Sequence, residues 1–376
     1  MAKGGRLMSE SSDVLSQDWS VHPGAFLRDV LANKRIPQSE LAARAGLTAK
    51  HINQIVTESI GISGDVALAL ERVLGVPVDF WINSNAHYEA FLSQRRAAHR
   101  LPDYTDWALG FHQPTLERNG IVRPTDHPTK KAERLLKFFE VANPDAFART
   151  WLQPRVAFRR SQHFTVDHQN TALWLRLVER TAERAAVADF RPAALRRLTP
   201  TIARLTSFSL AEGFSAARTA LAETGVALSF VREIPGTRVL GATLWLPGDR
   251  PAIGVTERQK KPDVLWFNVL HEIGHLLLHP RRTTFLDLER DKGTPDAAEE
   301  EANRFAENEL VPEHEVAQIE AAKSKDQLLL IAARLGVGSS VVAGRHGRVT
   351  QRWDFASSLR GRISEDDVAQ LEGLTQ

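Results

Sequence analysis

The sequence predicts a multidomain, mainly α-helical protein with a smaller α+β part toward its C-terminal end. Its 376 residues exceed the usual size of one domain. Apolar residues recur at helical spacing in most segments, and short β-rich segments divided by Pro and Gly appear from residue 226 onwards. We therefore expect a flexible tail at 1–21, a five-helix domain at 22–95, a linker and Arg-rich helical spacer at 96–225, an α+β domain at 226–350 and a C-terminal tail at 351–376.

The composition excludes several classes of protein. Apolar residues make up 43% and charged residues 25% of the chain, as in ordinary soluble globular proteins. The absence of cysteine excludes disulfides, a thiol nucleophile and a Cys-ligated zinc site. No apolar run approaches the roughly 20 residues of a membrane span, and the N-terminal segment lacks the apolar core of a signal peptide. A cytoplasmic protein is expected.

The charge is unevenly distributed, although the net charge is only +2. Residues 128–209 contain 15 Lys and Arg against 7 Asp and Glu, whereas residues 226–330 contain 13 against 18. This difference suggests separate partners for the two regions, or mutual docking. Nine arginines of the basic region either form a nucleic-acid surface or lie on solvated helix faces. They are Arg155, Arg159, Arg160, Arg176, Arg180, Arg184, Arg191, Arg196 and Arg197.

Residues 38–56 have the pattern of two helices joined by a tight turn. Gly46 stands where the turn needs a positive φ, and Thr48 is suited to cap the second helix. The outward side chains of such a recognition helix can reach base edges, while the start of the preceding helix can bind a phosphate. The alternative is a helical dimerisation domain without DNA. The predicted DNA-contacting residues are Gln38, Ser39, Thr48, Lys50, His51, Asn53 and Gln54.

This N-terminal region, from residue 22 to about 92, resembles the Xre-type helix-turn-helix of the HigA class of antitoxins. The resemblance rests on "HPG", "SELAARAGLTAKHINQIV" and "GDVALALERVLGVPVDFWINSNAHYEAF". It implies a lambda-repressor-like fold, binding to operator DNA as a homodimer, and restraint of a partner toxin. The segment "TESIGIS" departs from the pattern because it is less basic than many such loops. Fewer phosphate contacts would make binding weaker and less sensitive to salt.

The segments "GVALSFVRE", "RVLGATLWLP" and "RPAIGVTE" predict a small sheet ahead of a helix that begins near Pro262. The stretch "GATLWL" is either an exposed edge strand that pairs with an extended peptide or a strand that only supports the helix. In that helix His271 and His275 are four residues apart and share one face, as two ligands of one metal must. Glu272 would project beside the metal, where it could take the proton of a bound water.

A catalytic zinc needs a third protein ligand and an open position for water. The segment "AAEEEANRFAENELVP" predicts a later helix that can return a carboxylate, 24 residues after His275. Glu299, Glu300 and Glu301 are consecutive, so about 100° separates each from the next and only one can face the metal. With Glu299 chosen, Asn303 lies one turn further on the same face, where it could orient a histidine.

Residues 226 to about 345 resemble the ImmA/IrrE family of zinc endopeptidases, through "WFNVLHEIGHLLLH" and "EEEANRFAENELVP" in that order after a sheet. The resemblance implies a zincin-like domain of the gluzincin type, with His271, His275 and Glu299 as zinc ligands and Glu272 as general base. It also implies a protein substrate, either a repressor or a toxin partner, in stress, phage or mobile-element control. The alternatives are a structural zinc, or an antitoxin-like transcription factor whose metal domain senses a ligand or binds a toxin without proteolysis.

No side chain is assigned to stabilise an oxyanion. The two tyrosines, Tyr88 and Tyr104, precede the sheet, whereas His279 and His314 are candidates without a decisive pattern. Near the C-terminal end, "DQLLLIAARLGVGSSVVAGRHGR" repeats the pattern of "SELAARAGLTAKHINQ". Its apolar positions are expected to pack in the core, and a second DNA-reading unit is the alternative. The expected packing positions are Ala332, Leu335 and Val341.

Overall fold

The computed structural model describes residues 21–152, 166–281, 283–288 and 297–375. The chain divides into two compact units, residues 1–103 and 104–376. The first therefore extends past the predicted boundary at residue 95, because helix α5 (Val78–Arg100) continues without a break through that position. Within the described ranges, no helix combines the length and the apolar character that crossing a membrane requires.

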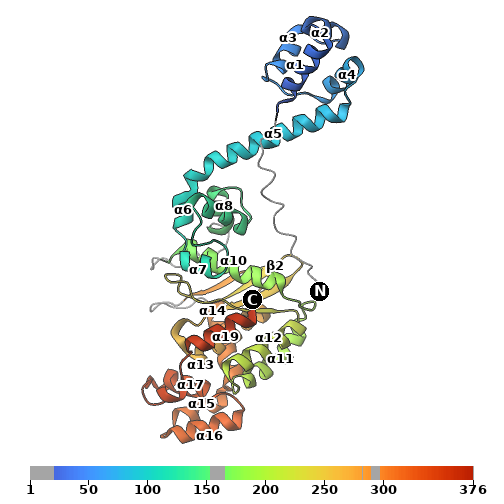
Figure 1. The fold of residues 1–376 in the computed structure, drawn as a ribbon. Helices are drawn as coiled ribbons and strands as arrows, with labels where there is room; N and C mark the ends of the chain where they lie inside the picture. The colour runs from blue at the N-terminus through green and yellow to red at the C-terminus, as the bar shows by residue number, and fades with distance from the viewer. Residues whose placement is uncertain (1–20, 153–165, 282, 289–296, 376) are drawn as a thin grey trace, which may run out of the picture. The chain divides into compact units, whose positions relative to one another are not determined.

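The first unit is the predicted five-helix domain (Figure 1). Its core contains Leu27, Ile52, Ile55 and Trp81, all fully buried. Gly46 ends the second helix with φ +67°, a value that L side chains rarely adopt. The helices before α5 are α1 (Pro23–Lys34), α2 (Gln38–Ala45), α3 (Ala49–Val56) and α4 (Gly64–Leu74).

The second unit has a four-stranded sheet with strand order β1-β3-β2-β4. Strand β1 (Ala227–Phe230) is parallel to β3 (Arg250–Val255), whereas β2 (Val239–Leu246) is antiparallel to both β3 and β4 (Phe285–Leu288). The stretch "GATLWL" lies in β2. Its first three residues pair with both β3 and β4, so the edge-strand interpretation is wrong for that half, whereas Leu244 to Leu246 pair with β3 alone among the described residues. Among the described residues the sheet ends at β4, a strand of only four residues that the sequence pattern does not predict.

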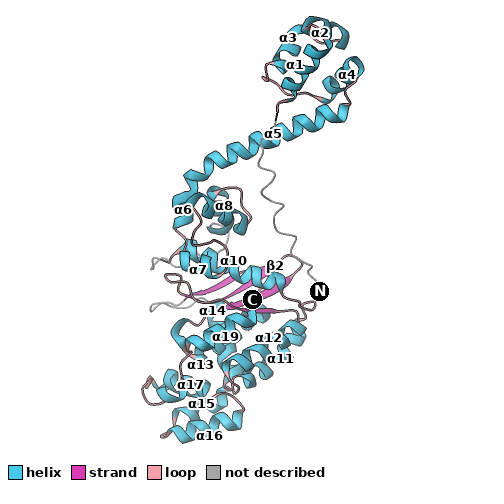
Figure 2. Cartoon of the chain, viewed as in Figure 1, coloured by secondary structure: helices cyan, strands magenta, loops and turns pink. Residues whose placement is uncertain are grey.

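Side chains of the sheet alternate between two hydrophobic cores. Ala252 belongs to a core shared with α10 (His168–Arg184), whereas the next residue, Ile253, belongs to a core shared with α13 (Pro262–Leu278). Figure 2 shows the sheet with helices on both sides. Gly254 permits the close approach of α10, because a Cβ there would come within 2.4 Å of Val178 and 2.9 Å of Trp174.

From residue 104 on, the predicted helical spacer is part of the second unit. The remaining elements here are η1 (Leu101–Tyr104), α6 (Thr105–Leu109), α7 (Gln113–Arg118), α8 (Pro128–Phe139), α9 (Pro144–Phe147), η2 (Ala148–Leu152), α11 (Pro192–Leu205) and α12 (Leu210–Glu223). Helices α8 and α10 contribute to the core on one face of the sheet, whereas α11 and α12 contribute to the core shared with α13. The fully buried apolar residues of the spacer include Leu135, Leu173 and Trp174, at positions where the sequence predicts apolar helix faces.

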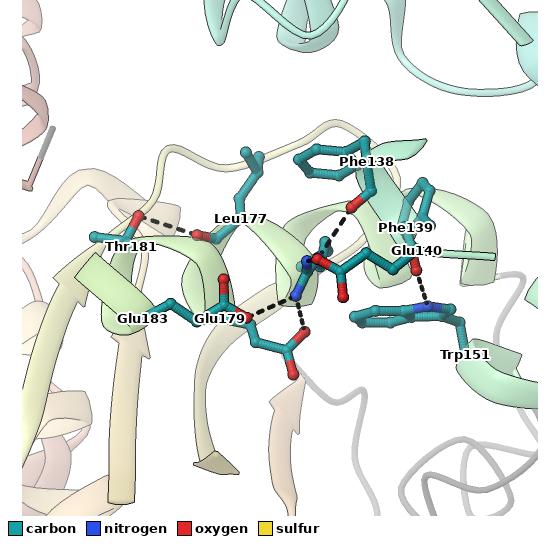
Figure 3. A network of polar contacts seen from close by, with 9 residues as sticks. Phe138, Phe139, Glu140, Trp151, Leu177, Glu179, Thr181 and Glu183 are labelled. Carbon is teal, nitrogen blue, oxygen red and sulfur yellow. Dashed lines mark hydrogen bonds and ion pairs between the residues drawn. The ribbon is translucent and has the colours of Figure 1, made fainter. Parts of the chain in front are cut away.

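Arg176, one of the arginines considered for a nucleic-acid surface, is buried and bound to protein groups. Its guanidinium donates to Glu140, Glu179 and Glu183 and to the carbonyl oxygen of Phe138, which ties α10 to α8 and the residue that follows it (Figure 3). With three acidic partners, this guanidinium serves packing rather than phosphate binding. Arg155, Arg159 and Arg160 lie outside the described residues.

The predicted C-terminal tail is also wrong, because helix α19 (Glu365–Thr375) packs against α12 and β1. Val368 and Leu371 are buried in the same core as α13, and the hydroxyl of Thr375 donates to the carbonyl oxygen of Phe230. The other elements of this end are η4 (Arg258–Lys260), α14 (Ala297–Leu310), α15 (Glu313–Glu320), α16 (Lys325–Leu335), α17 (Ser339–Thr350) and α18 (Ser357–Arg360). The repeated helical pattern packs as expected, with Ala332 and Val341 buried and Leu335 partly buried.

Candidate metal centre and DNA-binding surface

Helix α13 carries the two predicted histidines through the interior of the second unit. Pro262 occupies its first turn, where the missing N–H is no loss, and Asp263 adds an acidic group favourable to a helix start. Almost every side chain from Leu265 to Leu276 is buried, because the sheet covers one side of the helix and α14 another. His271 and His275 are thereby held one turn apart inside a rigid layer.

The structure brings His271, His275 and Glu299 together, with one ligand atom from each lying within 4.8 Å of the others. The two histidine Nε2 atoms are 3.0 Å apart, and the Glu299 carboxylate lies 3.6 Å from His271 Nε2 and 3.7 Å from His275 Nε2. Two ligand atoms on a tetrahedral zinc lie about 3.4 Å apart when each bond is about 2.1 Å. These two nitrogens and one carboxylate therefore fit a zinc ion.

Gly274 allows α14 to approach the histidines closely. A Cβ at this position would lie 3.0 Å from Phe305 and 3.3 Å from the Cα atom of Ala302. Contacts of that length are tighter than nearly all real Cβ contacts, so a larger residue would push the two helices apart. The glycine thus sets the helix spacing at which the carboxylate of Glu299, near the start of α14, meets His271 and His275.

The Glu272 carboxyl group is fully buried beside this group of ligands. Thr243 on β2 donates to its Oε2 at 2.6 Å, while Oε1 has no hydrogen-bond partner among the described residues. Burial raises the pKa of Glu272 well above its usual value, with Asp287 and Glu299 adding to the rise and the Thr243 hydrogen bond opposing it. A Cβ at Gly241 would lie 2.7 Å from Oε1, so a larger residue at this position of β2 would displace the carboxylate.

The groups weighed for a supporting or oxyanion role lie in different places. Asn303 lines a cavity together with Glu299, but within the described residues it makes no hydrogen bond to either histidine of α13. His279 contacts His275 through their Nδ1 atoms, 3.0 Å apart. His314 is exposed on α15, and Tyr88 belongs to the first unit, where its ring meets that of His22 edge-on. Tyr104 packs against the core shared with α10.

A cavity of about 590 Å³ adjoins the metal-ligand group. Glu299 and Asn303 line it from α14, Asn268 from α13 and Asp287 from β4. Asn268 is 1% exposed, and its amide nitrogen has no partner among the described residues. The sequence could have indicated this residue, since it lies three positions before His271 on the same helix face. Thr243 and Asp287 come from other strands, so no local pattern points to them.

The predicted DNA-contacting residues lie on α2 and α3 of the first unit. Ser39, Lys50 and Asn53 are exposed, whereas Gln38, His51 and Gln54 are partly buried. Thr48 caps α3 as predicted, because its hydroxyl oxygen accepts from the backbone N–H of His51 at 3.1 Å. One lone pair of its hydroxyl is therefore used at the helix end, which leaves the O–H donor and a second lone pair available to DNA. The arrangement of a short helix, a glycine turn and a capped second helix is that of a helix-turn-helix.

Comparison with known proteins matches one segment of each unit to a family. Residues 27–81 match the helix-turn-helix family, and residues 230–346 match the IrrE N-terminal-like domain of the M78 peptidase family. Virulence-associated protein I of Dichelobacter nodosus is 31% identical over 77 residues, which are 20% of this chain and 71% of that protein. No solved structure matches the chain. The chain is a DNA-binding regulator of the helix-turn-helix family fused to an IrrE N-terminal-like domain of the M78 peptidase family.

Proposed function

We propose that this protein is a zinc-dependent endopeptidase that binds operator DNA and cleaves a repressor or partner protein in stress, phage or mobile-element control. The observation that carries the proposal is the buried group of His271, His275 and Glu299 with the Glu272 carboxylate beside it. A structural zinc site is closed by four protein ligands, whereas a catalytic site has three and leaves a position for water. This group supplies three, and the carboxylate next to it is placed to act as a general base.

His271, His275 and Glu299 would hold the metal. A bound zinc supplies Lewis-acid activation of a water and of the scissile carbonyl group. Glu272 would take the proton of that water at Oε1 and later pass it to the leaving amine. Thr243 keeps Oε2 in place through its 2.6 Å hydrogen bond, so that the other oxygen retains one orientation. The surrounding apolar side chains exclude other water from the carboxylate.

The substrate would occupy the cavity beside Glu299 and extend along β4. Strand β4 is one of the two edge strands among the described residues, so it can pair with an extended peptide through main-chain hydrogen bonds. The amide of Asn268 would bind a peptide group of that segment. A buried amide without a partner costs about 1–3 kcal/mol, and a substrate that pairs with it recovers this cost.

We therefore expect Asn268→Leu to increase stability and decrease proteolysis. The substitution removes an unpaired polar group from a site that is 1% exposed, so the free energy of unfolding should rise by about 1 kcal/mol. The substrate loses a hydrogen bond, so cleavage should fall about tenfold. Urea unfolding and cleavage rates measure the two effects. A loss of both stability and activity would assign Asn268 to packing instead.

The helix-turn-helix would bring the peptidase to an operator, as a homodimer. Asn53 on α3 is exposed and suited to adenine, so Asn53→Ala should cost about 1–3 kcal/mol of discrimination at one base pair. Lys50→Ala should instead weaken binding to all sequences and reduce the salt dependence, as expected for a phosphate contact. Gel-shift titrations over a salt series, on operator and scrambled duplexes, separate the two effects. Arg96→Ala on α5, whose guanidinium bonds Ser93, serves as the control and should change neither.

The proposed activity is tested by intact-mass spectrometry on the zinc-loaded protein beside Glu272→Gln. Each is incubated with operator DNA and with candidate repressor or toxin partners from the same source. Fragments produced only by the wild type would establish proteolysis and identify the cut site. If neither protein cuts while both bind zinc and DNA, the endopeptidase proposal is wrong, and the IrrE-like domain is a sensing or toxin-binding module.

A further inference from the structure

His279 lies directly after α13 and outside the motif that contains the two metal-binding candidates. Its side chain is only 7% exposed, although the residue follows the end of the helix. The C-terminal end of α13 therefore directs this histidine inward. The proposed reaction leaves it without a role, because the ring faces His275 instead of the substrate cavity, whose lining does not include His279.

His279 lies between His275 and the carboxylate of Glu301 on α14. Its Nδ1 lies 3.0 Å from His275 Nδ1, and its Nε2 lies 3.3 Å from Oε2 of Glu301. The order of contacts is thus Glu301, His279, His275 and then the metal position. Phe285 of β4 stacks on the His275 ring, with centroids 4.0 Å apart and planes inclined by 15°, and it also contacts His279 at 5.2 Å.

These contacts permit one arrangement of protons when a metal is bound. His275 Nε2 faces His271 and Glu299, so it is the nitrogen that must be unprotonated to bind the ion. A neutral His275 then carries its proton on Nδ1 and donates it to His279 Nδ1. His279 Nδ1 accepts, which leaves the proton of that ring on Nε2, 3.3 Å from Oε2 of Glu301, a contact of ion-pair length and not a hydrogen bond. The His275 proton thus meets an acceptor, while the His279 proton lies near a carboxylate without a hydrogen bond to it.

We infer that His279 and Glu301 are positioning residues that fix the tautomer and ring orientation of His275 and thereby strengthen zinc binding. Histidine ligands usually donate their second N–H to an acceptor, and losing that acceptor weakens metal binding about 10–100-fold. Here the acceptor is a second histidine, and a carboxylate 3.3 Å from its other ring nitrogen favours the proton there. This inference rests on the metal site of the proposed function but not on proteolysis.

The two glutamates at the start of α14 would then serve the same histidine by different routes. Glu299 faces His275 Nε2 from the metal side, at 3.7 Å, while Glu301 acts on the opposite ring nitrogen through His279. Two positions along a helix are about 200° apart, so the pair reaches His275 from separate sides. Glu300, between them, is exposed and contacts neither histidine among the described residues, so it provides a matched control.

Zinc affinity tests the inference without a substrate. The dissociation constant is measured by competition with a chromophoric chelator for the full-length wild type and four variants. His279→Phe keeps the ring but removes the acceptor, so affinity should fall about 10–100-fold. His279→Asn places an oxygen near the former Nδ1 and should recover most of the affinity. Glu301→Gln should have a smaller effect, since Glu301 is 51% exposed, and Glu300→Gln should have none.

Nitrogen-15 spectra of the histidine rings in zinc-loaded protein give a second readout that packing alone would not change. We expect the proton on Nδ1 of His275 and on Nε2 of His279. Equal zinc affinity for wild type and His279→Phe, or a proton on Nδ1 of His279, overturns the inference. If zinc binds as described but no protein is cut, the endopeptidase proposal fails while this inference stands; absence of zinc binding defeats both.

Discussion

Glu272→Gln should abolish proteolysis while zinc binding, DNA binding and fold are retained. General-base catalysis contributes about 10²–10⁴-fold to a rate, and glutamine cannot accept the proton. The replacement is nearly isosteric, so it fits the space beside Gly241 where a Cβ would lie 2.7 Å from Oε1. It also keeps an oxygen for the Thr243 hydroxyl, which donates to Oε2 in the wild type. The loss should appear in kcat, because the removed step belongs to the chemistry and not to substrate binding.

Substituting Thr243, which hydrogen-bonds the Glu272 carboxylate, should give a smaller effect than substituting Glu272 itself. Thr243→Val keeps the shape of the side chain but removes the 2.6 Å hydrogen bond to Glu272, so kcat should fall by a smaller factor, about tenfold. Glu257 is a buried glutamate elsewhere, whose carboxylate accepts from the backbone N–H of Glu233, so Glu257→Gln serves as the control. It should leave kcat unchanged even if stability decreases. A Glu272→Gln enzyme that still cuts at the wild-type rate would remove Glu272 from the mechanism.

The parts of the fold predicted correctly are those that local sequence determines. In the helix-turn-helix, Gly46 adopts φ +67° and Thr48 caps α3, as the short pattern from residue 38 to 56 predicts. The pair of histidines on α13 is equally local, since four residues of one helix set their spacing. Each of these predictions depends on neighbours within about one or two turns of helix.

The parts predicted wrongly depend on how distant segments pack. The stretch "GATLWL" has the same apolar pattern at an edge as in the interior, and only the pairing of Gly241 to Thr243 with β4 makes its first half interior. Strand β4 itself has four residues and lies close after α13, too short for a pattern of alternation to be clear. From the sequence alone, Arg176 could be a surface cation. Only the packing of α8, which brings the carbonyl oxygen of Phe138 to its guanidinium, excludes this.

In the candidate site, too, local sequence predicts some features while others depend on the packing of distant segments. The run of three glutamates indicates a carboxylate but not its direction, because the approach of α14 to α13 decides which one meets His271 and His275. That approach depends on Gly274, whose contacts with Ala302 and Phe305 span the two helices. Thr243 is 29 residues from Glu272 and touches it only because β2 lies beneath α13. Supporting residues of this kind follow from the tertiary structure.

The C-terminal segment gives the largest expected effect on stability. Leu371→Ala should lower the free energy of unfolding by about 2–5 kcal/mol, because Leu371 is fully buried and its truncation leaves a cavity in the core. Gln370→Ala, on the exposed side of the same helix, should change it by less than about 0.5 kcal/mol. Urea unfolding followed by circular dichroism measures both values.

The comparison separates a structural helix from a tail. A flexible tail at 351–376 predicts that both substitutions have no effect, whereas packing of α19 on α12 and β1 predicts that only Leu371→Ala does. The loss of packing at Leu371 should also affect the metal centre, because Leu371 belongs to the same core as Val269 and Ile273 of α13. Loosening that core should also weaken zinc binding, because the ligands are held by the packing of α13 and not by their own loops. Zinc affinity of Leu371→Ala equal to that of the wild type would show that the helix pair holds its ligands without the C-terminal segment.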